Sequence, residues 1–103
     1  EQIVSYFEVH YAEKMTLDTI AENMYLSPFY ISKIFKSETG EAPIRHLINI
    51  RLQKALELLQ KEGYTNIKEV AAAVGYDDAY HFSKLFKKHF GFPPSQAKKS
   101  INL

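Results

Sequence analysis

Two short stretches of this sequence place basic and hydroxyl side chains at the same spacing. Ser32-Lys33, followed by Phe35-Lys36, recurs 51 residues later as Ser83-Lys84, followed by Phe86-Lys87. Lysine can bond to guanine, serine can bond to several base edges or to phosphate, and nearby aromatic rings can pack on thymine methyl groups. These residue types therefore favour recognition of a nucleic acid.

The sequence lacks the residue patterns of catalytic and metal sites. It contains no nucleophile–base pair, no glycine-rich phosphate loop and no cysteine. Its four histidines, His10, His46, His81 and His89, do not have the spacing of metal ligands. We expect no enzymatic activity, no cofactor and no metal ion.

Composition places the chain among folded domains. It has 103 residues, of which 46% are hydrophobic and 14% aromatic, so it can bury a core. The longest stretch without a charged residue, Asn23 to Ser32, is ten residues, too short to cross a membrane. The absence of cysteine fits a reducing compartment, so we expect a cytoplasmic protein that does not bind membranes.

The net charge of +1 conceals four blocks of alternating sign. Residues 1–24 sum to −4, 25–54 to +3, 55–78 to −3 and 79–103 to +5. Clustered helix faces exposed to solvent are the simpler explanation of these blocks, so the charge pattern alone does not identify a partner. Both basic blocks, however, coincide with the repeated Ser-Lys stretches.

The elements that position these stretches are expected to be helices. Apolar residues every four positions predict a helix over 2–12. Capping and helix-breaking residues predict further helices over 17–24, 28–39, 43 to about 63 and 67–74. They also predict one between Asp77 or Asp78 and Gly91, and a last short one from Pro93. On the long helix the predicted buried face holds Ile44, Leu47, Ile48, Leu52, Ala55, Leu56 and Leu59.

An internal repeat organises these helices into two units. Gly40 and Pro43 fall on Gly91 and Pro94 at a shift of 51, and Ile20-Ala21 falls on Val70-Ala71 at a shift of 50. Each copy is a short helix, a tight turn and a longer helix, which is a helix-turn-helix. We predict an all-α fold of about seven helices, with subdomains 1–42 and 64–103 joined by a linking helix, 43–63.

A helix-turn-helix places its second helix in the major groove of DNA. In the first copy Ile31, Ile34 and Phe35 are expected to be buried, and in the second Phe82, Leu85 and Phe86. The side chains left facing outward are Pro28, Phe29, Ser32, Lys33 and Lys36, and Ala79, Tyr80, His81, Ser83, Lys84, Lys87 and Lys88. Of these, Lys36, Lys87 and Lys88 are candidates for phosphate contact or for a purely solvated role.

The linking helix suggests how one molecule would use both copies. About 20 residues of helix are ~30 Å long, and successive major grooves on one side of a duplex are ~34 Å apart. One chain could therefore read two adjacent grooves without dimerising, with the DNA bent or one copy docked more weakly.

The sequence resembles the C-terminal DNA-binding domain of the AraC/XylS family of bacterial transcription activators, from about Ile3 to Lys99. The resemblance rests on the segments 26–36, 38–40, 51–52, 58–59, 70–71, 74–78 and 82–88, and on Ala55, Ile67, Gly91 and Pro94-Ser95. It departs from the family where Tyr is usual, at His46, His81 and Ala97. It also carries Lys98 for the usual Arg, and Tyr25 where the second copy has Gly75.

The resemblance implies base contacts from Pro28, Phe29, Ser32 and Lys33 in the first copy. In the second it implies contacts from Ala79, Tyr80, His81, Ser83 and Lys84. It also implies double-stranded DNA and RNA polymerase as partners. Because the chain starts at Glu1, we expect a longer regulator with a sensing or receiver domain before it.

A different class of function remains open from the residues alone. A helix-turn-helix scaffold can serve as a helical protein–protein interaction module, and titration against random duplex at low and moderate salt distinguishes the two. Arg51, in the middle of the linking helix, can hold an acidic group or approach phosphate, and we favour a structural role for it.

Overall fold

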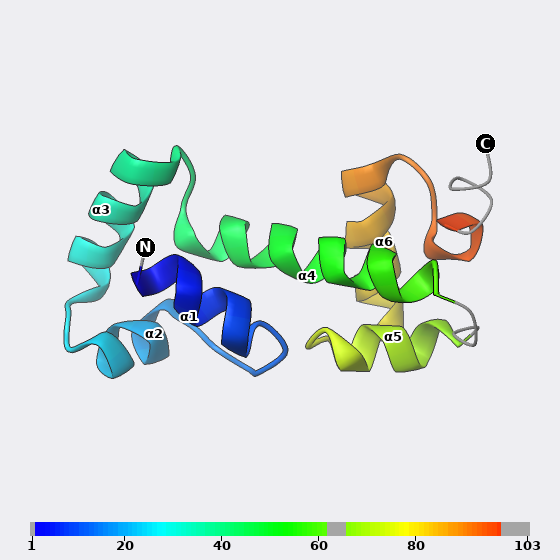
Figure 1. The fold of residues 1–103 in the computed structure, drawn as a ribbon, viewed down its shortest axis with the longest axis horizontal. Coiled ribbons are helices and arrows are strands. Elements are labelled where there is room, and N and C mark those ends of the chain that lie inside the picture. Colours follow the sequence, from blue (N-terminus) through cyan, green and yellow to red (C-terminus); the bar gives the residue numbers. More distant parts are fainter. Residues whose placement is uncertain (1, 62–65, 98–103) are drawn as a thin grey trace. The chain divides into compact units, whose positions relative to one another are not determined.

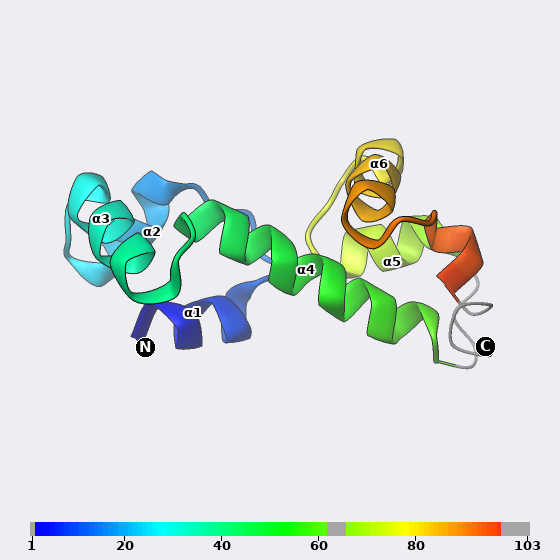
Figure 2. The same cartoon turned by 90° about the horizontal axis from the view of Figure 1, so that it is seen from above.

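The computed structural model describes residues 2–61 and 66–97 and contains only helices over these ranges (Figure 1). The helices are α1 (Gln2–His10), α2 (Leu17–Met24), α3 (Pro28–Thr39), α4 (Pro43–Leu59), α5 (Ile67–Ala73), α6 (Ala79–Phe90) and the 3-10 helix η1 (Pro94–Gln96). The predicted all-α fold is confirmed. The chain forms two compact units, Glu1–Ile50 and Arg51–Leu103, and α4 runs through the boundary as one helix (Figure 2).

Local capping interactions explain where most helices begin. Thr16 caps α2 and forms a reciprocal capping box with Thr19. The Ser27 hydroxyl accepts a hydrogen bond from the Tyr30 backbone N–H at 3.1 Å, and Pro28 occupies the first position of α3. Asn66 caps α5. Side-chain acceptors of this kind satisfy backbone N–H groups that have no partner within the helix.

The N-terminal cap of α6 is one of the two residues that the sequence left open. Asp78, and not Asp77, caps α6, because its carboxylate accepts from the backbone N–H groups of Tyr80 and His81 at 3.0 and 3.3 Å. Gly40 and Gly91 end α3 and α6 with φ values of 85° and 88°, in the left-handed region that glycine tolerates.

The core of the first unit joins α1, α2, α3 and the start of α4. Its buried residues are Phe7, Ile20, Ala21, Ile31, Phe35 and Leu47. His46, where the family usually has Tyr, lies edge-on to Phe35 with 5.2 Å between ring centroids. The imidazole therefore serves as an aromatic core neighbour at this position.

The second unit has its own core. It consists of Leu52, Ala55 and Leu59 from α4, Val70 and Ala71 from α5, Phe82 and Phe86 from α6, and Val74, Tyr76 and Ala97. In α6, Phe86 also packs against Phe90, with 4.6 Å between centroids. In both units a short helix is followed by a tight turn and a longer helix that crosses it (Figure 1).

Five details differ from the sequence predictions. α1 ends at His10 and α4 at Leu59, earlier than expected, although Gly63 lies outside the described residues. Val74 is the residue after α5 and not its last residue. Ile44, predicted on the buried face of α4, is 37% exposed, whereas the preceding residue Pro43 is fully buried. The last short helix is a single 3-10 turn.

Candidate nucleic-acid interface

The second helix of the first unit, α3, has one buried and one exposed face. Ile31 and Phe35 are buried, and Ile34 is half-buried. On the other side Phe29 is 76% exposed, Lys33 and Lys36 are exposed, and Pro28 and Ser32 are half-buried. A shallow open hollow on this face is lined by Phe29, Ser32, Lys33, Lys36 and Ser37. Four of the five predicted outward residues of α3, all except Pro28, thus line one open surface.

The second helix of the other unit, α6, repeats this arrangement. Phe82 and Phe86 are completely buried and Leu85 is half-buried, while Tyr80 is 72% exposed. The remaining predicted site residues are exposed at His81, Lys84, Lys87 and Lys88 and half-buried at Ala79 and Ser83. Every predicted site residue therefore keeps at least part of its side chain accessible.

The two helices present their side chains in the same register. Phe29 and Lys33 are the second and sixth residues of α3, and Tyr80 and Lys84 are the second and sixth residues of α6. Because residues four apart are neighbours on a helix, each pair shares a face. In α6 the Lys84 Nζ lies 5.1 Å from the centroid of the Tyr80 ring, within the range of a cation–π interaction.

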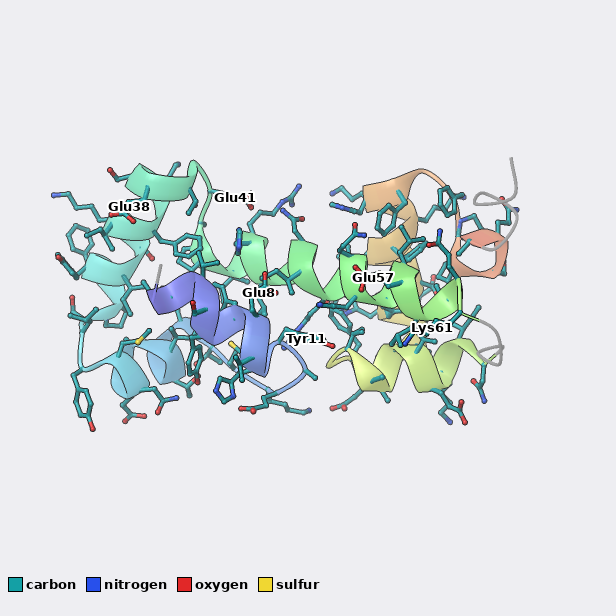
Figure 3. All side chains as sticks on the ribbon, in the orientation of Figure 1. Glu8, Tyr11, Glu38, Glu41, Glu57 and Lys61 are labelled. Atoms are coloured by element: carbon teal, nitrogen blue, oxygen red, sulfur yellow. The ribbon has the colours of Figure 1, made fainter. Side chains whose placement is uncertain are left out.

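The charge on the two exposed faces is unequal. No acidic residue occurs anywhere in 79–103, and α6 carries Lys84, Lys87 and Lys88. The basic residues of its last turn also suit the negative end of the helix dipole. In α3 two exposed lysines are accompanied by exposed Glu38, near the C-terminal end of the helix (Figure 3). The face of α6 is therefore the more cationic one.

The first unit also exposes aromatic residues that are not among the predicted DNA contacts. Tyr30 is 48% exposed and Tyr25 is 94% exposed. The repeat could have identified Tyr30, because a shift of 51 aligns it with His81. Tyr25 occupies the turn between α2 and α3 with φ 58°, a left-handed conformation that is unfavourable for a residue with a Cβ atom. The unusual residue noted in this turn thus has an unusual backbone.

Arg51 has the structural role that the sequence favoured. Its side chain is only 9% exposed, and its guanidinium carbon lies 5.2 Å from the centroid of the Tyr76 ring. Burial raises the pKa of the Tyr76 phenol above its ordinary value, although the neighbouring Arg51 acts in the opposite direction. The Arg51 side chain therefore belongs to the interior of the second unit.

Two other kinds of feature, a metal-binding cluster and a membrane-spanning helix, are absent from the described part of the chain. Across residues 2–61 and 66–97, no three His, Asp or Glu side chains come together in a way that could hold a metal ion. None of the helices there combines the length and apolar character needed to cross a bilayer. The two exposed helix faces are the features that remain to be explained.

Two copies of a short helix, a tight turn and an exposed second helix define the class of tandem helix-turn-helix domains. Residues 20–100 match the family described as "Helix-turn-helix domain". The chain belongs to the AraC-type helix-turn-helix family.

Three relatives illustrate the similarity. The transcriptional activator RhaS of Salmonella schwarzengrund is 33% identical over 98 residues, which cover 95% of this chain and 35% of RhaS. The C-terminal domain of AraT, a response regulator from Geobacillus stearothermophilus, matches with a TM-score of 0.91 and 37% sequence identity. The match covers 96% of this chain and 82% of the AraT chain. The DNA-binding domain of AdpA, solved with a target DNA, matches with a TM-score of 0.89 and 27% sequence identity. The match covers 98% of this chain and 90% of the AdpA chain. The chain spans about a third of the length of the curated relatives it matches.

Proposed function

We propose that this chain binds double-stranded DNA sequence-specifically, with α3 and α6 each entering a major groove. The observation that carries the proposal is the matched pair of exposed helix faces, each with an aromatic, a serine and a lysine in the same register. Such side chains suit base edges, and a helix is the element that fits the major groove. The relationship to the AdpA domain, solved on DNA, supports the same function.

The proposed base contacts are those implied by the resemblance to the AraC/XylS family. They lie in the first six residues of α3 and α6, in agreement with recognition helices that contact base edges through their N-terminal residues, and the proposed phosphate contacts are lysines farther along each helix. The base-contacting residues are Pro28, Phe29, Ser32, Lys33, Ala79, Tyr80, His81, Ser83 and Lys84, and the phosphate-contacting residues are Lys36, Lys87 and Lys88.

Within this proposal, residues 1–42 and 64–103 are the two DNA-binding subdomains, and residues 43–63 are the segment that links them. Helix α4 has 17 residues and is therefore ~25 Å long. Because this helix joins the two units, we propose that the DNA bends when both units occupy adjacent major grooves, or that one unit docks more weakly than the other. Fluorescence energy transfer between dyes at the ends of the duplex measures such a bend directly.

The complete protein is proposed to be a bacterial transcription regulator acting in the cytoplasm, and an activator in particular. The similarity to RhaS, a transcriptional activator, supports this assignment. Because this chain corresponds to about a third of its curated relatives, a further sensing or receiver domain is proposed to control it. RNA polymerase is the proposed protein partner.

A binding titration tests the function. The domain is titrated against a random-sequence duplex at low and then moderate salt, with fluorescence anisotropy as the signal. We expect binding at low salt that weakens as salt rises, because each neutralised phosphate contributes ~0.9 to the salt slope. No binding at either salt would reject the proposal and favour a protein–protein interaction module.

A further inference from the structure

The second and sixth residues of the two recognition helices, α3 and α6, form the same arrangement of side chains twice. Tyr80 and Lys84 in α6, and Phe29 and Lys33 in α3, each combine an exposed aromatic ring with an exposed lysine four residues later. The two copies differ in the intervening residues at two of three positions, yet both keep serine just before the lysine. This shared pattern indicates that both pairs of side chains bind the same kind of chemical group.

The α6 pair shows what the ring does in the free domain. Lys84 Nζ lies 5.1 Å from the Tyr80 ring centroid, so the ring holds the ammonium group on the outer face of the helix. A lysine that is already held in place loses less conformational freedom on binding than one that is free in solvent. Tyr80 is therefore a positioning residue for Lys84 as well as a contact surface of its own.

The chemistry and spacing of each pair define what it can recognise. The apolar ring fits the C5 methyl of thymine, and the ammonium group fits O6 and N7 of guanine. Side chains four apart on a helix have Cβ atoms about 5–6 Å from each other, while base pairs are ~3.4 Å apart. The two bases read by one pair therefore lie within two base pairs of each other.

We infer, on the basis of the proposed DNA-binding function, that the DNA bound by each recognition helix contains a thymine and a guanine within two base pairs of each other. We call the DNA bound by one recognition helix a half-site. Phe29 or Tyr80 packs on the thymine methyl, and Lys33 or Lys84 bonds to the guanine. Since both helices carry the same pair in the same register, the two half-sites share this element.

Single-atom changes in the DNA test the inference. A duplex is first selected by this chain from a random pool, and each thymine is then replaced in turn by uracil and each guanine by 7-deazaguanine. In each half-site we expect uracil at one thymine to weaken binding about fourfold, the effect of losing one buried methyl group. We expect 7-deazaguanine to weaken binding at a guanine no more than two base pairs away.

Matched protein variants connect each atom to its side chain. In Tyr80→Ala the uracil effect should disappear in one half-site only, and in Phe29→Ala in the other, while Tyr80→Phe should retain it. In Lys84→Ala the 7-deazaguanine effect should disappear beside the same thymine. Both aromatic residues are largely exposed, so these variants are expected to fold, which circular dichroism checks.

The positioning role has its own readout in the free domain. The Tyr80 ring should shift the NMR signals of the Lys84 ε-methylene group upfield, and Tyr80→Ala should abolish that shift. Failure of wild-type protein to bind any duplex would reject the proposed function itself. Binding that is indifferent to uracil at every thymine, or a sensitive thymine and guanine more than two base pairs apart, would overturn this inference alone.

Discussion

Replacing Tyr25 by Gly is expected to stabilise the first unit. Tyr25 has φ 58°, and its side chain is 94% exposed, so it buries little surface in return for its conformation. A left-handed residue with a Cβ atom costs roughly 1–2 kcal/mol. Glycine removes that cost but adds roughly 0.5–1 kcal/mol of backbone entropy in the unfolded chain. The net gain in the free energy of unfolding therefore lies between about 0 and 1.5 kcal/mol, with a mid-range value of ~0.75 kcal/mol.

Urea denaturation followed by circular dichroism measures this gain, with Tyr25→Ala as the matched control. Alanine removes the exposed ring but keeps the Cβ atom, so this variant should show no gain. At the corresponding turn of the second unit Gly75 has φ 103°, and Gly75→Ala should lower stability. A loss of stability in Tyr25→Gly, or an equal gain in Tyr25→Ala, would refute the reasoning that backbone strain dominates at Tyr25.

Three further predictions concern the second unit. Phe82→Ala should lower the free energy of unfolding by ~3–5 kcal/mol, because the ring is completely buried. Its control, Val9→Ala at a 73% exposed site in α1 of the first unit, should be nearly neutral. An equal loss for both variants in urea denaturation would contradict the assignment of Phe82 to the core. Asp78→Ala should cost about 1 kcal/mol through loss of the α6 cap, and Asp78→Asn should preserve most of it. Because burial raises the Tyr76 pKa, the folded state holds that proton more tightly than the unfolded chain, so stability should fall as pH rises above ~10. Tyr76→Phe should have a shallower decline over that range, and an unchanged profile would exclude Tyr76 as its source.

The sequence predicted the features that depend on neighbouring residues. Thr16, Ser27 and Asn66 cap their helices because their side-chain oxygens reach backbone N–H groups two or three positions ahead, and this geometry is local. The apolar spacing in 79–90 predicted which face of α6 is buried, and Phe82 and Phe86 are buried there. The repeat then placed a second helix of the same kind in each unit.

Features that depend on tertiary packing were less accessible. Ile44 has the spacing of a buried residue but is 37% exposed, although its neighbour Pro43 in the same first turn of α4 is fully buried. The exposure of Tyr30 depends on how α3 lies on its unit, although alignment with His81 gave a usable signal. The cation–π distance between Tyr80 and Lys84 depends on side-chain rotamers, which spacing alone does not determine.

Selection of bound sequences from a random duplex library at moderate salt is the most direct test of the account. Two recognition helices in adjacent major grooves predict enrichment of two short half-sites whose centres are about 10–10.5 base pairs apart, one helical turn. Enrichment of a single short half-site would contradict the use of both grooves. Binding without enrichment of any sequence would contradict the central claim that α3 and α6 read base edges.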